Sequence, residues 1–203
     1  VRTRHGIARI EERTASKVVT TGCGQGSVFG GLMDEVDRIE LPHAQLTQAQ
    51  LYGLVNAIRL KETTYKSAGS VHGCALFRGE DMLVFVEDVG RHNAIDTIAG
   101  WMWMNPEAPS AAPSTQAGQT DTASYRPMGG ADKVFYTTGR LTSEMVIKSA
   151  QMGVPIVVSR SGMTQMGHAV AQQLGLCAIG RATNRRFVCY AGAHRLVLQP
   201  ELA

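Results

Sequence analysis

The sequence predicts an α/β fold in which helices cover a parallel sheet. Through the second half of the chain, strands at Val134–Thr138, Pro155–Ser159 and Leu176–Ile179 alternate with helices at Thr142–Met152 and Met163–Leu174. Such alternation is typical of parallel strands joined by crossover helices. The chain has 203 residues, of which 44% are hydrophobic and 18% charged. That is enough to bury the core of one domain, alone or with an appendage.

The helices of this half have recognisable ends. Gly153, with Pro155 beyond it, ends the first helix, and Gly175 ends the second. We expect four side chains of the second helix to face the core: Met166, Ala169, Val170 and Leu174. Two short strands follow, at Phe187–Tyr190 and Leu196–Leu198.

The first half of the sequence predicts a further helix, whose beginning is clearly marked. Thr47 and Gln50 fit a capping box. An apolar stripe at i, i+3, i+4 and i+7 then predicts a face packed on the core. It consists of Leu51, Leu54, Val55 and Ile58.

A hairpin and another helix come next. The runs Val71–Phe77 and Met82–Val86 flank a polar turn and predict two paired strands. The helix after them carries Ile95, Ile98, Ala99 and Met102 on one face. Near the beginning of the chain lies a short β-branched run, Lys17–Thr21, and Ser27–His43 shows no clear period.

Composition separates a proline-rich segment from the rest of the chain. Asn105–Asp132 holds four prolines among Ala, Ser, Thr, Gly and Gln, and such a segment buries too little apolar surface to offset the entropy of ordering. We therefore expect a flexible insertion at 105–132 within an α/β core at 46–203. Residues 1–45 form an N-terminal segment with a cysteine loop. The chain begins at Val1, so we expect it to start inside a longer protein.

Charge and cysteine usage narrow the function classes. A net charge of +3 is too mild to indicate a nucleic-acid-binding protein, but it is compatible with an anionic small ligand. No apolar run approaches the ~20 residues of a membrane helix, so no membrane contact is expected. Four cysteines without C-x-x-C spacing make a structural zinc site and a disulfide framework improbable. We expect no zinc and a cytoplasmic location.

Cys23 differs from the other cysteines in its surroundings. It lies in Thr20–Ser27, a stretch with three glycines, and glycine permits a mobile backbone. Cys74, Cys177 and Cys189 lie in apolar runs and read as buried small hydrophobes. The loop alone leaves a reactive thiol and a simple turn as equal alternatives, because reactivity depends on thiolate character and exposure.

Polar and basic residues follow several predicted strands. In open α/β sheets ligands bind beyond the carboxyl ends of the strands, and free N–H groups at helix N-termini favour anions. Glu87–Asn93 supplies Arg91 and His92, and Thr137–Ser143 supplies Gly139 and Arg140. Ser159–Thr164 repeats the pattern. The next segment consists of Arg181, Ala182, Thr183, Asn184, Arg185 and Arg186.

Together these segments predict an anion pocket at one sheet edge. A capped helix start with a local ion pair remains the alternative for Glu87–Asn93, and an exposed basic turn the alternative for Arg181–Arg186. No P-loop and no G-x-G-x-x-G opens a helix, which disfavours ATP hydrolysis and dinucleotide redox chemistry. The H-x-E and P-C-x-x-C elements of a zinc deaminase are missing as well.

The run Glu87–Asp96, E-D-V-G-R-H-N-A-I-D, resembles the signature of the FdhD family, the formate dehydrogenase accessory sulfurtransferases. Further resemblances follow in the right order from about Thr20 onward. They are Thr20–Gly24 (the cysteine loop), Gly69–Leu76, Gly139–Met145 with Lys148, and Gly153–Pro155.

This resemblance implies a cytidine-deaminase-like three-layer sandwich without zinc, preceded by a small β-rich part that is truncated here. It implies that a persulfide on Cys23 carries sulfur from a cysteine desulfurase to the bis-molybdopterin guanine dinucleotide cofactor of formate dehydrogenase. Arg181–Arg186 corresponds to the cofactor-binding stretch of the family, which would hold the guanine nucleotide moiety. A homodimer remains open.

Two departures keep alternatives open. Many members have C-G-x-C, and Gly26 stands here for the second cysteine, which excludes a relay between two thiols. The family's S-A-P-T turn is Ser161–Thr164, S-G-M-T. A cofactor-binding chaperone without sulfur chemistry is the main alternative. A nucleotide hydrolase with His92 or His72 as base and Cys23 as nucleophile is the third, although no nucleophile–base motif supports it.

Overall fold

The structure is a computed structural model that describes residues 17–20, 26–29, 36, 38–61, 63–106 and 129–202. The chain divides into two compact units, residues 1–40 and 41–203. In the first unit, β1 (Lys17–Thr20) pairs antiparallel with β2 (Gly26–Phe29), with Thr20 opposite Gly26. The short β-branched run at Lys17–Thr21 thus begins with a strand, whereas no periodic pattern in the sequence indicated β2. Cys23 belongs to the five residues that connect the two strands and lies outside the described residues.

The second unit is built on a six-stranded sheet in the order β5-β4-β6-β7-β8-β9. Its strands are β4 (His72–Arg78), β5 (Asp81–Asp88), β6 (Lys133–Thr137), β7 (Ile156–Ser159), β8 (Cys177–Thr183) and β9 (Arg186–Ala191). The three strands predicted to run parallel, β6, β7 and β8, do so, and the predicted hairpin of Val71–Phe77 and Met82–Val86 is confirmed as β4 and β5, so the sheet is mixed rather than wholly parallel. Helices join the parallel strands β6, β7 and β8, whereas two-residue turns join β4 to β5 and β8 to β9 and make those pairs antiparallel. β4 also runs antiparallel to β6.

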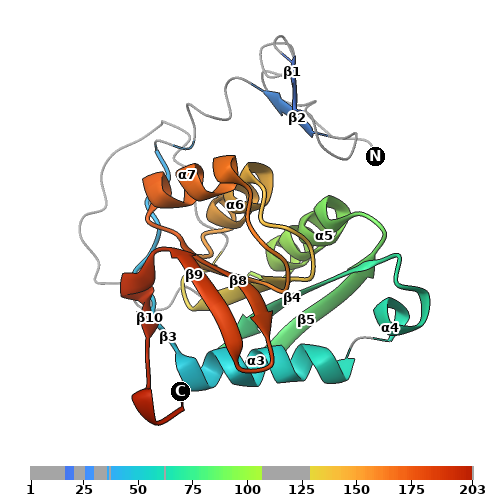
Figure 1. The fold of residues 1–203 in the computed structure, drawn as a ribbon. Helices are drawn as coiled ribbons and strands as arrows, with labels where there is room; N and C mark the ends of the chain where they lie inside the picture. The colour runs from blue at the N-terminus through green and yellow to red at the C-terminus, as the bar shows by residue number, and fades with distance from the viewer. Residues whose placement is uncertain are drawn as a thin grey trace. The chain divides into compact units, whose positions relative to one another are not determined.

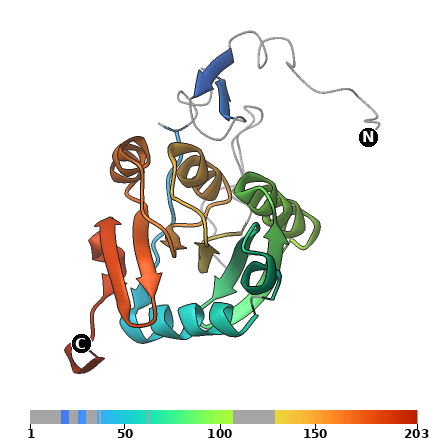
Figure 2. The same ribbon diagram turned by 45° about the vertical axis from the view of Figure 1, so that its right-hand side comes forward.

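Helices lie on both faces of this sheet and make three layers (Figures 1 and 2). α3 (Gln48–Lys61) covers one face, and its side chains share a core cluster with alternate residues of the strands, such as Phe77, Tyr136 and Val158. The opposite face carries α5 (Arg91–Met104), α6 (Ser143–Gln151) and α7 (Gln165–Leu174). The likeness to cytidine deaminases stays a prediction.

Smaller elements complete the unit. α4 (Thr64–Ala68) follows α3, and two short 3-10 helices, η1 (Ala193–Arg195) and η2 (Pro200–Leu202), lie near the end of the chain. β3 (Leu46–Thr47) and β10 (Leu196–Val197) form a separate parallel pair. No helix among the described residues is long and apolar enough to cross a membrane.

The beginning of α3 confirms the capping box. The backbone N–H of Thr47 donates to Oε1 of Gln50 at 3.0 Å, and the N–H of Gln50 donates to Oγ1 of Thr47 at 3.2 Å. This reciprocal pair satisfies two donors that a helix start leaves open. The predicted stripe Leu51, Leu54, Val55 and Ile58 is buried.

The inward face of α7 differs from the prediction. Val170 is buried as predicted and Leu174 is half-buried, but Met166 and Ala169 are exposed. Gly167 and Ala171 are buried in their place. Gly167 explains the rotation. A Cβ built on it would lie 2.6 Å from the carbonyl oxygen of Leu141, so the helix approaches its neighbour too closely there for any larger residue. Ala99 of α5 is likewise only half-buried.

The predicted insertion has ordered ends. Asn105 caps α5 by donating from its backbone N–H to the carbonyl of Trp101. At the other end, Asp132 pairs with Arg78 at 2.6 Å and with Lys133 at 3.0 Å. Residues 107–128 lie outside the described residues, and their flexibility stays a prediction.

Candidate functional site

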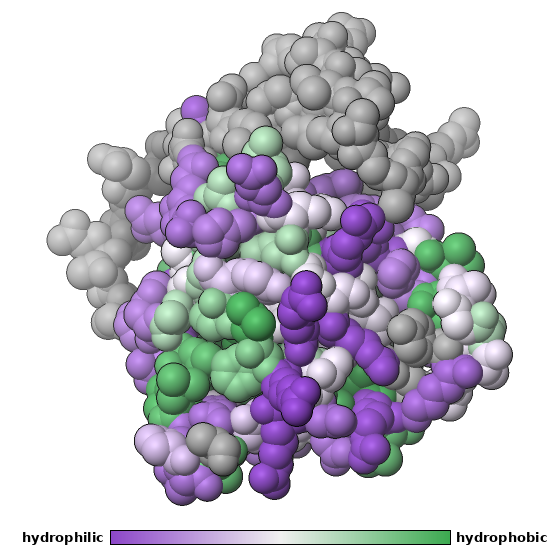
Figure 3. Space-filling model, viewed as in Figure 1, coloured by the Kyte–Doolittle hydropathy of each residue, from purple (hydrophilic) through white to green (hydrophobic). Residues whose placement is uncertain are grey.

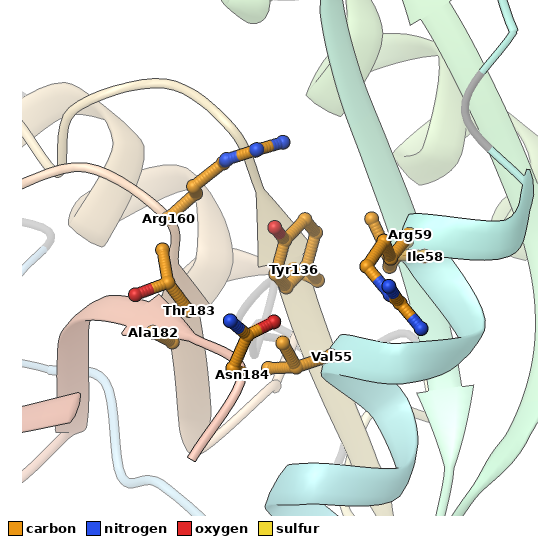
Figure 4. Close-up of a pocket in the computed structure, with 8 residues that line it drawn as sticks. All are labelled: Val55, Ile58, Arg59, Tyr136, Arg160, Ala182, Thr183 and Asn184. Carbon is orange, nitrogen blue, oxygen red and sulfur yellow. The ribbon is translucent and has the colours of Figure 1, made fainter. Parts of the chain in front are cut away.

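A groove opens between α3 and the β8–β9 hairpin, at the carboxyl ends of the parallel strands (Figure 4). Tyr136 lies in the middle of the close-up, with Asn184 and Arg59 on opposite sides of the hollow. The remaining lining residues are Val55, Ile58, Arg160, Ala182 and Thr183. This groove lies on the α3 face of the sheet, and the anion pocket expected at this edge stays a prediction.

The groove continues along α3 toward the end of the hairpin. This second part shares Val55, Arg59 and Asn184 with the first and adds Tyr52, Gly53, Asn56 and Arg185. The Tyr52 hydroxyl donates to the backbone carbonyl of Arg185 at 3.2 Å and ties the hairpin turn to the helix. Figure 3 shows a band of strongly hydrophilic side chains down the middle of the molecule's face on this side.

Arginines from three separate elements line the groove: Arg59 from α3, Arg160 after β7 and Arg185 from the hairpin turn. Guanidinium groups present a fixed fork of donors that fits the oxygens of phosphate. The half-buried Tyr52 adds aromatic surface beside them, and the buried Tyr136 lies at the bottom of the groove. This combination suits an anionic ligand with a flat ring, such as a nucleotide.

The backbone along the groove is strained at two places. Arg181 and Asn184 have φ values of 52° and 53°, the left-handed region that non-glycine residues seldom occupy. Asn tolerates this conformation, whereas Arg does not do so readily. The N–H of Arg181 donates to the carbonyl of Ser161 at 2.8 Å, and the pairing of β8 with β9 shifts register between Gly180 and Thr183. Strain of this kind is typical of functional sites.

The same region corrects the expected strand boundary. The sequence predicted a strand that ends at Ile179 and a basic turn after it, but β8 continues to Thr183 and β9 begins at Arg186. Only Asn184 and Arg185 form the turn. The sequence did not show that β8 extends beyond Ile179, because the exposed edge of a hairpin needs no apolar residues.

A second polar cluster lies on the other face of the sheet edge, beside α5 and α6. Its centre is Arg91, the first residue of α5, whose side chain is only 8% exposed. Gly139 lies against it, since a Cβ built on Gly139 would come within 2.7 Å of Cδ of Arg91 and 3.4 Å of Nδ1 of His72. His92 is next to Glu144, with Nδ1 and Oε1 separated by 3.4 Å.

Hydroxyl groups hold the strand ends around this cluster. The Thr137 hydroxyl oxygen accepts from the N–H of Gly139 at 3.0 Å, and the Thr138 hydroxyl oxygen accepts from the N–H of Gly73 at 3.1 Å. The Ser159 hydroxyl donates to the carbonyl of Gly139 at 2.6 Å. The turn after β6 is thereby fixed from both neighbouring strands.

Both histidines of the cluster favour the neutral form. Burial lowers the pKa of His72, and the nearby Arg91 guanidinium lowers it further. Burial also lowers the pKa of His92, although the Glu144 carboxylate opposes this shift. The fixed positive charge at this place is therefore that of Arg91.

The structure shows local hydrogen bonds within Glu87–Asn93, and a ligand site there stays a prediction. Oδ1 of Asp88 accepts from the N–H of Gly90 at 2.7 Å and from the Asn93 amide at 3.2 Å, which is a local capping arrangement. Arg91 is buried instead, without a carboxylate partner among the described residues.

The three described cysteines differ in chemical state. Burial raises the pKa of Cys74 to about 12 and, with a hydrogen bond to Cys189, raises that of Cys177 as well. The hydrogen bond from Cys177 lowers the pKa of the half-buried Cys189 to about 7. Cys189 is thus less inert than its apolar sequence context indicated.

The structure divides the predicted site residues between two faces. Ala182, Thr183, Asn184 and Arg185 line the groove on the α3 face, and Arg181 and Arg186 flank them. Arg91, His92 and Gly139 gather on the α5–α6 face. Arg140 is exposed and is not among the residues that line the groove.

Sequence reasoning missed the contribution of α3 to the groove. Tyr52, Asn56 and Arg59 border the apolar stripe, so the helix periodicity places them at its edge. The stripe did not reveal that this edge faces the β8–β9 hairpin. Among the described residues, no three His, Cys, Asp or Glu side chains lie close enough together to hold a metal ion.

These features define the protein as an α/β domain with arginine-containing polar clusters on both faces of its sheet. The chain belongs to the FdhD/NarQ family, whose model matches residues 1–197. The resemblance found in the sequence is thereby confirmed.

Individual relatives agree with this assignment. The chain is 27% identical over 181 residues to the sulfur carrier protein FdhD of Bacillus subtilis, an alignment that covers 89% of this chain and 61% of that protein. It is 28% identical over 160 residues to the protein of the same name from Halalkalibacterium halodurans, covering 79% and 52%. The chain therefore spans about three fifths or less of the length of these relatives.

A solved structure supports the fold. The crystal structure of a protein from Desulfotalea psychrophila, described as a formate dehydrogenase accessory protein, matches with a TM-score of 0.65 and 26% identity. The match covers 80% of this chain and 62% of that one.

Proposed function

We propose that this protein is a sulfur carrier that serves formate dehydrogenase. In this role Cys23 accepts sulfur from a cysteine desulfurase, and the groove holds the guanine nucleotide moiety of a bis-molybdopterin guanine dinucleotide cofactor that receives the sulfur. Family membership and the names of the relatives support sulfur carriage and a formate dehydrogenase partner. These partners and the reducing environment that free thiols need make the cytoplasm the proposed location.

The proposed binding of the guanine nucleotide moiety rests on the groove and its three arginines. Arg59 lines both parts of the groove, Arg160 lines the first part with Tyr136, and Arg185 lines the second part. Arginines suit the pyrophosphate, and aromatic surface suits a purine ring. The strained backbone at Arg181 and Asn184 indicates that this rim is shaped for a ligand.

Sulfur carriage needs one thiolate. The Cys23 thiolate would attack the outer sulfur of a persulfide on the desulfurase, the sulfur–sulfur bond of the donor would break, and the donor would leave as a thiolate. Cys23 would then carry the additional sulfur. The glycines around Cys23 suit a residue that has to meet two partners.

A chaperone that binds the cofactor without carrying sulfur is the second candidate, because Gly26 stands where many members have another cysteine. Mass spectrometry separates the two. After incubation with a cysteine desulfurase and cysteine, we expect a gain of one sulfur atom on the peptide that contains Cys23, and its loss on treatment with a thiol reductant.

The Cys23→Ala variant should lose both the added sulfur and the activation of formate dehydrogenase, while its melting temperature is unchanged. Cys189→Ala is the matched control and should keep both. If Cys23→Ala activates formate dehydrogenase fully, the chaperone function replaces sulfur carriage.

A further inference from the structure

We propose that Arg91 is the centre of a second anion-binding site, on the α5–α6 face of the sheet edge, which takes a phosphate-class oxyanion. This site is separate from the groove. Tyr136 faces α3 and lines the groove, whereas the next residue, Thr137, contacts Cys74 on the other side of the sheet. Successive residues of a strand point to opposite faces, so the sheet itself divides the two sites.

Arg91 is a buried cation without a partner in the described part of the chain. Its side chain is 8% exposed, and its Nε is fully buried with no acceptor within hydrogen-bond distance. Arginine stays charged in proteins, and a buried charge is strongly unfavourable unless it is paired. An oxyanion would supply the missing acceptor.

The nearby carboxylates are engaged elsewhere. Asp88 accepts hydrogen bonds from Gly90 and Asn93. Glu144 lies 3.4 Å from Nδ1 of His92 and 3.7 Å from Nζ of Lys148. Neither forms an ion pair with Arg91. The counter-charge that Arg91 requires is therefore absent from the described residues and has to come from outside them.

The beginnings of α5 and α6 add donors at the same place. The N-cap residues Gly90 and Thr142 make no side-chain capping bond, so the first N–H groups of both helices lack that partner. Oγ1 of Thr142 is also buried without a hydrogen-bond partner. Two buried polar atoms beside the helix N-termini, Nε of Arg91 and Oγ1 of Thr142, thus lack an acceptor, and an anion supplies one.

Gly139 leaves room for the Arg91 side chain at the centre of this site. A side chain there would overlap Cδ of Arg91 and approach Nδ1 of His72, with Cβ distances of 2.7 and 3.4 Å. The site offers one fixed positive charge and several N–H and O–H donors, which matches the tetrahedral oxygens of a phosphate group. The group can belong to a nucleotide or be inorganic phosphate.

Nuclear magnetic resonance of the arginine Nε–H groups tests this directly in the whole chain. Inorganic phosphate and GDP are titrated separately, and the Arg91 signal is assigned by its loss in Arg91→Lys. We expect phosphate-dependent movement of that signal, with phosphate binding at least about tenfold weaker in Arg91→Lys. Arg78→Lys, at the opposite end of β4, is the control and should bind phosphate like the unchanged protein.

Movement with both probes supports the site and shows that a nucleotide phosphate can enter it. If only inorganic phosphate moves the Arg91 signal, the ligand of the site is free phosphate. If only GDP moves the signal, the ligand is the phosphate of a nucleotide. If neither probe moves the Arg91 signal, the proposal is overturned. If Arg91→Lys does not fold, Gly139→Ala serves as the second variant and should weaken phosphate binding. Loss of GDP binding in Arg185→Ala concerns only the groove, so the two proposals can fail separately.

Discussion

Gly139 lies directly against the side chain of Arg91. A Cβ built on Gly139 would come within 2.7 Å of Cδ and 3.2 Å of Cβ of Arg91. Because both distances involve the inner part of the arginine side chain, a larger residue at position 139 would have to move Arg91 or the turn after β6.

This contact predicts that Gly139→Ala destabilises the protein. We expect a loss of about 1–3 kcal/mol, the range for overpacking a filled site, measured by urea denaturation. Gly100→Ala is the control. Gly100 lies inside α5 with no atom within 4 Å of an added Cβ, so that substitution should stabilise the protein by up to about 1 kcal/mol. Equal stabilities of the two variants would contradict the proposed packing.

The groove predicts which arginines bind a guanine nucleotide. Arg59→Ala and Arg185→Ala should each weaken GDP binding about tenfold or more, because charge-assisted hydrogen bonds contribute roughly 1.5–3 kcal/mol each. Calorimetric titration measures this, with Lys61→Ala at the end of α3 as control. Arg140→Ala should also be titrated, since the sequence assigned Arg140 to the same ligand. If the unchanged protein binds no GDP, the nucleotide part of the proposed function fails.

The segment 107–128 should be dispensable, whereas Asp132 should not. Replacing 107–128 with a short Gly/Ser linker should change the melting temperature little, because loop closure varies by only about 0.6 kcal/mol per doubling of length. Asp132 binds both Arg78 and the 3%-exposed Lys133, so Asp132→Ala should lower the melting temperature clearly. A large loss in the linker variant would show that 107–128 packs on the core.

The two neutral histidines predict acid sensitivity. The pKa values of His72 and His92 are lowered from 6.5 in the folded protein, so below about pH 7 the unfolded chain binds protons that the folded chain does not. Stability should therefore fall as the pH decreases from 7.5 toward 5 and should change little above 7.5. The double variant His72→Gln, His92→Gln should flatten the melting temperature between pH 7.5 and 5.5. An unchanged slope would assign the effect to other groups.

Local features of this chain could be predicted from sequence. The capping box of Thr47 and Gln50, the stripe on α3 and the stop at Gly175 depend on residues a few positions apart, and all three are as expected. The cluster of polar residues after the strands also indicated the edge at which the sites lie. The run E-D-V-G-R-H-N-A-I-D allowed the family to be recognised from sequence because it is long enough to be specific.

The tertiary structure alone decided which of these residues meet. Arg91 and Arg185 each come after a predicted strand in the sequence, yet they lie on opposite faces of the sheet. Arg59 joins the groove because α3 packs beneath the β8–β9 hairpin, and Gly167 turns α7 through its contact with Leu141. Strand order, the face that a residue occupies and the rotation of a helix depend on pairing and close packing between distant segments, and local preference does not encode them.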